Sequence, residues 1–230
     1  MNAAILTDLT KCIGCGACAV ICKQTNELPG EIGAKLDAYT WTVVESRKGH
    51  YVRRQCMHCL EPTCASVCPV AALHKTAYGA VTYDSGKCIG CRYCIMACPF
   101  DIPKYQWDRP VPIVGKCIMC VNKRLAHGKQ PACTETCPAS ATIFGDRKSL
   151  IKEARRRISK NPERYVNHIY GEKEAGGTSV MYLSPISFKE LGFKSNVIGG
   201  AYPELTWKII DKVPDVLGIG GITLFGIMWV

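Results

Sequence analysis

Residues 11–22 read KCIGCGACAVIC, and the four cysteines in this stretch are separated by two, two and three residues. The same spacing returns at residues 88–98. Two further quartets, at residues 56–68 and 117–137, keep the outer gaps and lengthen the middle gap to four and twelve residues. Together the quartets use all sixteen cysteines of the 230-residue chain. The chain is therefore organised by an internal repeat of a four-cysteine motif.

These spacings indicate metal ligation rather than disulfide bonding. Cysteines two or three residues apart lie too close in sequence to link distant segments, and a chain of this length can bury a core without disulfides. Three thiolates in one tight loop can bind three corners of a cubane [4Fe–4S] cluster, and the fourth cysteine lies farther along, on a short helix such as residues 17–25. Gly14, Gly16 and Gly90 permit the turns, and backbone N–H groups can offset the negative charge of the cluster. We therefore predict four [4Fe–4S] clusters, with iron bound by all sixteen cysteines.

The quartet at residues 117–137, taken alone, also fits a zinc ribbon. Its C-x3-C-P ending matches the second and third quartets, and the first quartet needs a partner, so we favour a fourth cluster. In the first quartet Lys23 stands where the others have proline, which we expect to alter the local turn more than the ligation. His58 lies between two cysteines, and we expect it only to pack. No arrangement of residues indicates a catalytic site.

The formal charge of +10 would suggest nucleic acid or an acidic membrane surface as a partner. A thiolate-bound [4Fe–4S] cluster carries a charge of about −2 when its core is oxidised, so four clusters would offset about eight of these positive charges. We therefore predict no nucleic-acid partner. A lysine precedes the first cysteine of three quartets, but Gln55 precedes that of the second. We expect Gln55→Lys to raise the reduction potential of the cluster bound by Cys56.

The connector between the second and third quartets indicates which quartets share a module. Residues 71–75 and 80–83 read as two strands joined by a glycine-containing turn, the hairpin expected inside one ferredoxin unit. The second and third quartets then form one module, and the first and fourth pair by elimination; the alternative pairs first with second and third with fourth. In two-cluster ferredoxins the fourth cysteine binds the other cluster. The predicted ligand sets are Cys12, Cys15, Cys18 and Cys137; Cys22, Cys117, Cys120 and Cys133; Cys56, Cys59, Cys64 and Cys98; and Cys68, Cys88, Cys91 and Cys94.

We predict an α+β fold, rich in loops, made of two bacterial-ferredoxin-like two-cluster modules with a C-terminal extension. Apolar or alternating stretches indicate strands. They are expected at residues 3–8, 40–45, 50–55, 80–83 and 142–144. The predicted domains are a four-cluster domain at 1–145, with an inner module (56–98) and an outer module (12–22 with 117–137); a cysteine-free docking extension at 146–213; and a membrane-anchoring helix at 214–230.

Within the extension, residues 149–159 read as a basic amphipathic helix, either solvated or docked to an acidic partner. Residues 171–213 contain a strand at 179–183, and the Pro- and Gly-punctuated stretch that follows it reads as an arm leading to the membrane. Residues 216–230, VLGIGGITLFGIMWV, are uncharged and mostly apolar. As a helix they would span about 22 Å, short of a bilayer core of about 30 Å. We expect a transmembrane helix whose far end lies beyond this sequence, in preference to a buried helix, and we find no cleavable signal peptide.

Four segments resemble the four-cluster iron–sulfur subunits of membrane-bound respiratory oxidoreductases. They are KCIGCGACAVIC (11–22), QCMHCLEPTCASVCPVAAL (55–73), KCIGCRYCIMACPF (87–100) and KCIMC (116–120) with CTETCPASATIFG (133–145). With YGEKEAGGTSVMYLS (170–184) and the apolar C-terminal run, the chain is most similar to formate dehydrogenase β subunits and hydrogenase-2-type iron–sulfur subunits.

The resemblance implies a non-catalytic electron-transfer subunit of an oxidoreductase complex. Such a subunit lies between a catalytic subunit, of the molybdopterin or nickel–iron type, and an integral membrane subunit that reacts with quinone. The resemblance also implies a location at the bacterial cytoplasmic membrane, where family members lie on either face. Those similar over residues 170–184 are mainly periplasmic, which favours the periplasmic face over the cytoplasmic one. The alternative function is that of a soluble polyferredoxin electron carrier.

Overall fold

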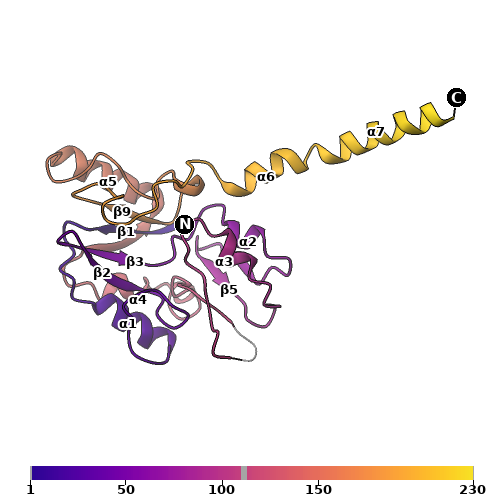
Figure 1. Cartoon of the computed structure of the whole chain (residues 1–230). Coiled ribbons are helices and arrows are strands. Elements are labelled where there is room, and N and C mark those ends of the chain that lie inside the picture. The colour runs from indigo at the N-terminus through magenta and orange to yellow at the C-terminus, as the bar shows by residue number, and fades with distance from the viewer. Residues whose placement is uncertain (1, 110–112, 230) are drawn as a thin grey trace.

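The computed structural model describes residues 2–109 and 113–229 as a body of short strands, short helices and long loops, from which two C-terminal helices project (Figure 1). The main sheet has three strands in the order β8-β1-β9. Its central strand β1 (Ala3–Asp8) is buried along its whole length. It pairs antiparallel with β8 (Thr142–Asp146) and parallel with β9 (Val180–Leu183). The strands predicted in these three places are confirmed.

Helix α5 (Arg147–Lys160) packs on this sheet and confirms the predicted basic helix. Its buried residues Leu150, Ala154 and Ile158 recur at helical spacing and join an apolar cluster that includes residues of β1 and β9. The Asp146 carboxylate caps the helix by accepting the N–H groups of its first turn, an interaction that satisfies otherwise unpaired donors.

Three two-stranded antiparallel sheets lie around the cysteine loops. They are β2 (Val43–Arg47) with β3 (His50–Arg54), β4 (Leu73–Lys75) with β5 (Val81–Tyr83), and β6 (Lys104–Tyr105) with β7 (Val114–Gly115). The hairpin predicted between the second and third quartets is confirmed as β4–β5. The strand predicted at 40–45 begins later, at Val43, because Asp37 Oδ1 accepts the N–H groups of Tyr39 (2.7 Å) and Thr40 (2.6 Å) and holds the preceding residues in a turn.

A short helix begins inside each quartet. The helices are α1 (Ala17–Asn26), α2 (Thr63–Ser66), α3 (Tyr93–Ala97) and α4 (Ala132–Glu135). The second residue of every one is the third cysteine of its quartet. The repeat in the sequence is therefore also a repeat in backbone structure, and α1 confirms the helix predicted at 17–25.

The largest apolar cluster joins the cysteine loops to the segment that follows β9. Ile5 and Met119 meet Tyr182 and Phe193 in this cluster, and the rings of Tyr182 and Phe193 pack edge to face with centroids 5.0 Å apart. Residues 184–193, the first part of the predicted arm, therefore belong to the body. The 3-10 turns η1 (Leu125–His127) and η2 (Glu174–Gly176) lie on either side of α5 in the sequence.

Helices α6 (Tyr202–Ile210) and α7 (Val213–Met228) extend in a row away from the body, and neither contains a buried residue (Figure 1). Of the stretch predicted to be helical at 214–230, the part up to Met228 is a helix, and Val230 lies outside the described residues. No helix in the described part of the chain combines enough length and apolar character to cross a bilayer. The prediction of a membrane-spanning helix gains no support from the structure.

Candidate cluster-binding sites

All four cysteine loops share one unusual backbone conformation. The residue just before the second cysteine has a positive φ in every quartet: Gly14 (74°), His58 (50°), Gly90 (74°) and Met119 (55°). This left-handed turn brings backbone N–H groups toward sulfur, since Gly90 N lies 3.4 Å from Cys88 Sγ and Met119 N lies 3.3 Å from Cys117 Sγ. The loops thus present donors to the first cysteine of the quartet, as a thiolate ligand requires.

A second shared turn follows the fourth cysteine in the three quartets that have proline there. The residue three positions later has a positive φ, and its N–H donates to the carbonyl oxygen of the cysteine. These residues are Ala71, Asp101 and Ser140. The next N–H reaches sulfur in two cases, Ala72 to Cys68 Sγ (3.2 Å) and Ile102 to Cys98 Sγ (3.5 Å).

The first quartet replaces this turn with a longer helix. Because Lys23 allows α1 to continue to Asn26, the side chain of Asn26 donates to the carbonyl oxygen of Cys22 (2.9 Å) and lies 3.8 Å from its sulfur. The predicted change of local turn is confirmed. A side-chain amide here takes the place that a backbone N–H has in the other quartets.

Two cavities are each lined by four cysteines drawn from two quartets. Set A consists of Cys12, Cys15, Cys18 and Cys137. Set D consists of Cys68, Cys88, Cys91 and Cys94. Apolar side chains such as Val44 and Ala141 complete the first cavity, and Leu73 and Val114 complete the second.

The other eight cysteines lie in two groups. Within each group, the cysteines are close enough to raise one another's pKa. Burial, then Cys133 and Cys120, raise the pKa of Cys22 to about 12. Burial, then Cys56 and Cys98, raise the pKa of Cys59. We call the groups set B and set C. Set B consists of Cys22, Cys117, Cys120 and Cys133. Set C consists of Cys56, Cys59, Cys64 and Cys98. The structure thus brings together the cysteines of each predicted set, and the assignment of one cluster to each set stays a prediction.

The four sets lie in the order A, B, C, D. After burial, which is the largest cause, cysteines of neighbouring sets also raise one another's pKa. The pairs that act across sets are Cys18 with Cys133, Cys117 with Cys56, and Cys64 with Cys94. Cys15 and Cys91, in the two outer sets, are exposed, whereas every cysteine of set B is buried. The row therefore has a buried middle and two ends that reach the surface.

The chemistry of the sets fits [4Fe–4S] clusters. Buried thiolates that face one another are unstable unless a positive centre offsets their charge. Iron supplies that charge and deprotonates the thiols that bind it. Among residues 2–109 and 113–229, no three His, Cys, Asp or Glu side chains are placed to hold a single metal ion. The cysteines of sets A and D surround cavities instead, as ligands of a many-atom cluster do.

Sets B and C are linked by two buried side chains. His58 Nδ1 accepts the N–H of Val81 (2.9 Å), so its Nε2 carries the proton and faces Cys117 Sγ at 3.5 Å. In the opposite direction, Lys116 Nζ donates to the carbonyl oxygen of Cys117 (2.9 Å) and lies 4.0 Å from Cys56 Sγ. The prediction that His58 only packs is wrong, because its Nε2 faces Cys117 of set B. Lys116 likewise faces Cys56 of set C, so each of the two loops places a donor beside a cysteine of the other set.

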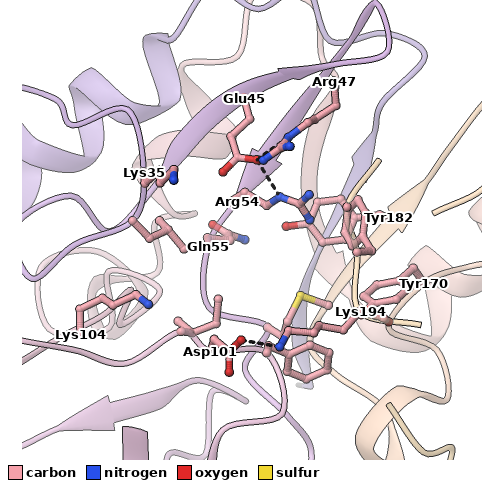
Figure 2. A pocket seen from close by; sticks show the side chains of 16 residues that line it. Lys35, Glu45, Arg47, Arg54, Gln55, Asp101, Lys104, Tyr170, Tyr182 and Lys194 are labelled. Atoms are coloured by element: carbon pink, nitrogen blue, oxygen red, sulfur yellow. Dashed lines mark hydrogen bonds and ion pairs between the residues drawn. The ribbon is translucent and has the colours of Figure 1, made fainter. Parts of the chain in front are cut away.

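A surface groove of about 290 Å³ opens beside set C (Figure 2). Gln55 and Asp101, each close in sequence to a set C cysteine, line it. Figure 2 shows the ion pairs on its walls, Glu45 with Arg54 (3.5 Å) and Lys194 with Asp101. The Lys194–Asp101 pair joins the segment after β9 to the loop that follows Cys98, whereas the Glu45–Arg54 pair joins the two strands of the β2–β3 hairpin.

Comparison with known protein families also identifies the cysteine quartets as [4Fe–4S] motifs. Two 4Fe–4S dicluster domain families match the chain, at residues 47–147 and 11–72. Two dicluster domains correspond to four [4Fe–4S] clusters, so the cofactor prediction is confirmed and zinc at the fourth quartet is excluded.

Several characterised proteins are similar over most of the chain. A protein of Nitratidesulfovibrio vulgaris is 44% identical over 240 residues, which cover 96% of this chain and 65% of that protein. The hydrogenase-2 operon protein HybA of Escherichia coli O157:H7 is 36% identical, over 81% of this chain and 71% of HybA. The iron–sulfur subunit of the nitrate-inducible formate dehydrogenase of Escherichia coli K12 is 38% identical, over 78% of this chain and 67% of that subunit. The chain thus spans about two thirds of the length of these relatives.

Proposed function

Because the chain belongs to the family of 4Fe–4S dicluster subunits that includes HybA and the formate dehydrogenase iron–sulfur subunits, we propose that it relays electrons within a respiratory oxidoreductase complex. The relay connects a catalytic subunit, of the molybdopterin or nickel–iron type, with an integral membrane subunit that reacts with quinone. The observation that carries the proposal is the row of sets A to D, with exposed cysteines in the two outer sets.

Each set holds one [4Fe–4S] cluster, and each cluster supplies one-electron chemistry when bound. The protein's own residues hold the clusters in line, exclude water from sets B and C, and donate hydrogen bonds to sulfur. Such donors favour the more negative, reduced state of a cluster. On this assignment, residues 56–98 form the inner module, and residues 12–22 with 117–137 form the outer one.

The two ends of the row face different partners. Cys15 and Cys91 are exposed, so a redox centre of another subunit can approach the clusters of sets A and D most closely. The solvent-exposed apolar helices α6 and α7 bind the membrane subunit or its surrounding lipid. We place the complex at the bacterial cytoplasmic membrane, on its periplasmic face. That location rests on the likeness to HybA and to formate dehydrogenase subunits alone.

The complex purified in mild detergent tests the proposal. It is expected to contain a catalytic and a membrane subunit, and about sixteen irons and sixteen acid-labile sulfides in this chain. Cys15→Ser and Cys91→Ser, at opposite ends, are expected to block electron transfer to one partner each while the far clusters stay reducible from the other end. A chain that purifies alone and exchanges electrons with several soluble donors would instead favour a soluble polyferredoxin.

A further inference from the structure

Arg53 on β3 is a buried cation without a protein anion. Its side chain is 1% exposed and is the largest fully buried side chain of the described residues. One guanidinium nitrogen, Nη2, donates to Gln55 Oε1. The other two, Nε and Nη1, have no hydrogen-bond partner among the described residues, and no ion pair within them includes Arg53. A buried charge in this condition is strongly unfavourable unless something else in its surroundings is negative.

The surroundings of Arg53 are cysteines of two sets. Its side chain lines the cavity of set A together with Cys18. Burial alone would lower the pKa of Arg53, but Cys133, Cys18 and Cys117 outweigh it and raise the pKa. Cys18 belongs to set A, whereas Cys133 and Cys117 belong to set B. Cys18 also lies on α1 one helical turn before Cys22 of set B, so Arg53 lies where the two sets meet.

We propose that Arg53 is a shared counter-cation for the clusters of sets A and B and holds the reduction potentials of both above the values they would otherwise have. The inference rests on the cluster assignment made under the proposed function. A cluster becomes more negative when it is reduced, and a fixed cation in a buried, low-dielectric site stabilises that state. Nε and Nη1 of Arg53, which have no acceptor among the described residues, provide hydrogen-bond donors that stabilise the same reduced state.

The neighbouring Arg54 provides a matched control. Adjacent residues of a strand point to opposite faces, and Arg54 faces the surface groove, where it pairs with Glu45 at 3.5 Å and stacks on Phe193. Arg53→Gln and Arg54→Gln thus remove the same charge one residue apart. Arg53→Lys keeps the charge near sets A and B while losing the planar fork.

The test is a potentiometric titration of the intact complex, followed by electron paramagnetic resonance, with iron measured in each sample. Arg53→Gln is expected to lower two of the four midpoint potentials, Arg53→Lys to restore them at least in part, and Arg54→Gln to change none. The proposal is overturned if Arg53→Gln leaves all four midpoints unchanged, or if Arg53→Lys shifts them as far as Arg53→Gln does.

Loss of clusters is informative in the same design. If Arg53→Gln loses iron and Arg53→Lys keeps it, the charge is required and the proposal stands. If both lose iron, Arg53 serves packing and the proposal fails. Failure of the relay itself would appear separately, in the unaltered complex, as unexpected partners or an iron content far from about sixteen per chain.

Discussion

At the scale of single residues, the cysteine loops depend on a left-handed turn that only some side chains tolerate well. Glycine adopts this conformation at no steric cost and occupies it in two quartets, whereas His58 and Met119 occupy it in the other two. Both of these larger side chains are buried, His58 against Cys117 and Met119 in the largest apolar cluster. Their contacts offset the cost of the turn.

Gly90→Ala tests this requirement. A Cβ at Gly90 would lie 2.7 Å from Tyr105 Oη, in addition to the cost of about 1–2 kcal/mol for a left-handed turn. Gly128→Ala is the control, because Gly128 has a φ of 70° and open space around the added Cβ. We expect Gly90→Ala to lower the thermal unfolding midpoint and iron content clearly more than Gly128→Ala. Equal effects would show that the close contact with Tyr105 is unimportant.

The cysteine spacing predicted which residues would gather, because short gaps leave a loop few ways to point several thiols at one cluster. The cations were not predictable in the same way. Gln55 was expected to leave the cluster of Cys56 without the cation that a lysine provides, yet Lys116 of another quartet lies 4.0 Å from Cys56 Sγ. Contacts between residues so distant in sequence cannot be predicted from a local sequence pattern. The contact between His58 and Cys117 was missed for the same reason.

At the scale of elements, a buried polar contact fastens α5 to β1. The Asp8 carboxylate, at the end of β1, accepts hydrogen bonds from Arg157 Nη1 (2.9 Å) and Tyr165 Oη (2.9 Å). The same carboxylate accepts the hydroxyl of Thr10 at 2.7 Å. Asp8 is completely buried, so the charge of Arg157 is its main compensation.

Asp8→Asn is expected to destabilise the protein. Breaking a buried ion pair costs about 3 kcal/mol or more, which corresponds to a fall in Tm of about 10 °C in a chain of this size. Glu163→Gln, on the exposed segment after α5, removes a similar charge at the surface and is expected to change Tm little. Differential scanning calorimetry of the cluster-loaded protein measures both. A fall of only a degree or two for Asp8→Asn would mean that the pair contributes little.

The elements were predictable where apolar periodicity was strong, as in β1 and α5. Prediction was weaker where side chains set the boundary, as Asp37 does before β2. It was wrong for residues 184–193, read as the start of an arm, because the aromatic residues Phe188 and Phe193 are spaced irregularly and pack only through tertiary contacts.

At the scale of the whole molecule, two of the apolar clusters differ in whether cysteines take part in them. The apolar cluster of α5, β1 and β9, which includes Leu6 and Met181, contains no cysteine. The cluster around β4 and β5 includes Cys94, with Cys64 and Cys68 packed against it.

Removal of iron should therefore unfold the molecule unevenly. Because metal binding supplies folding energy at its ligands, hydrogen exchange in the chelated protein is expected to be fast at β4 and β5 and slower at β1 and β9. Reconstitution with iron and sulfide is the control and should restore protection at β4 and β5. Equal loss of protection in both regions would show that the two cores unfold together.

Removal of residues 200–230, which include α6 and α7, is expected to release the protein from membranes while leaving the cluster spectra intact. Both helices lack buried residues, so the body loses few contacts with them. Fractionation of cells that carry the shortened chain measures the release, and absorption spectra measure the clusters. Continued membrane association, or loss of the clusters, would contradict the assignment of these helices to partner binding.

The pairing of β1 with β8 and β9 also determines when the main sheet can form during synthesis of the chain. Strand β1 has its neighbours at residues 142–146 and 180–183, and set A is incomplete until Cys137 has been made. At about 5–20 residues per second, roughly 10–35 seconds pass between the synthesis of β1 and that of β9. During that interval the N-terminal cysteines are exposed on an unfinished chain. A cluster assigned to set A would consequently be inserted late, after the residues up to Cys137 have been made.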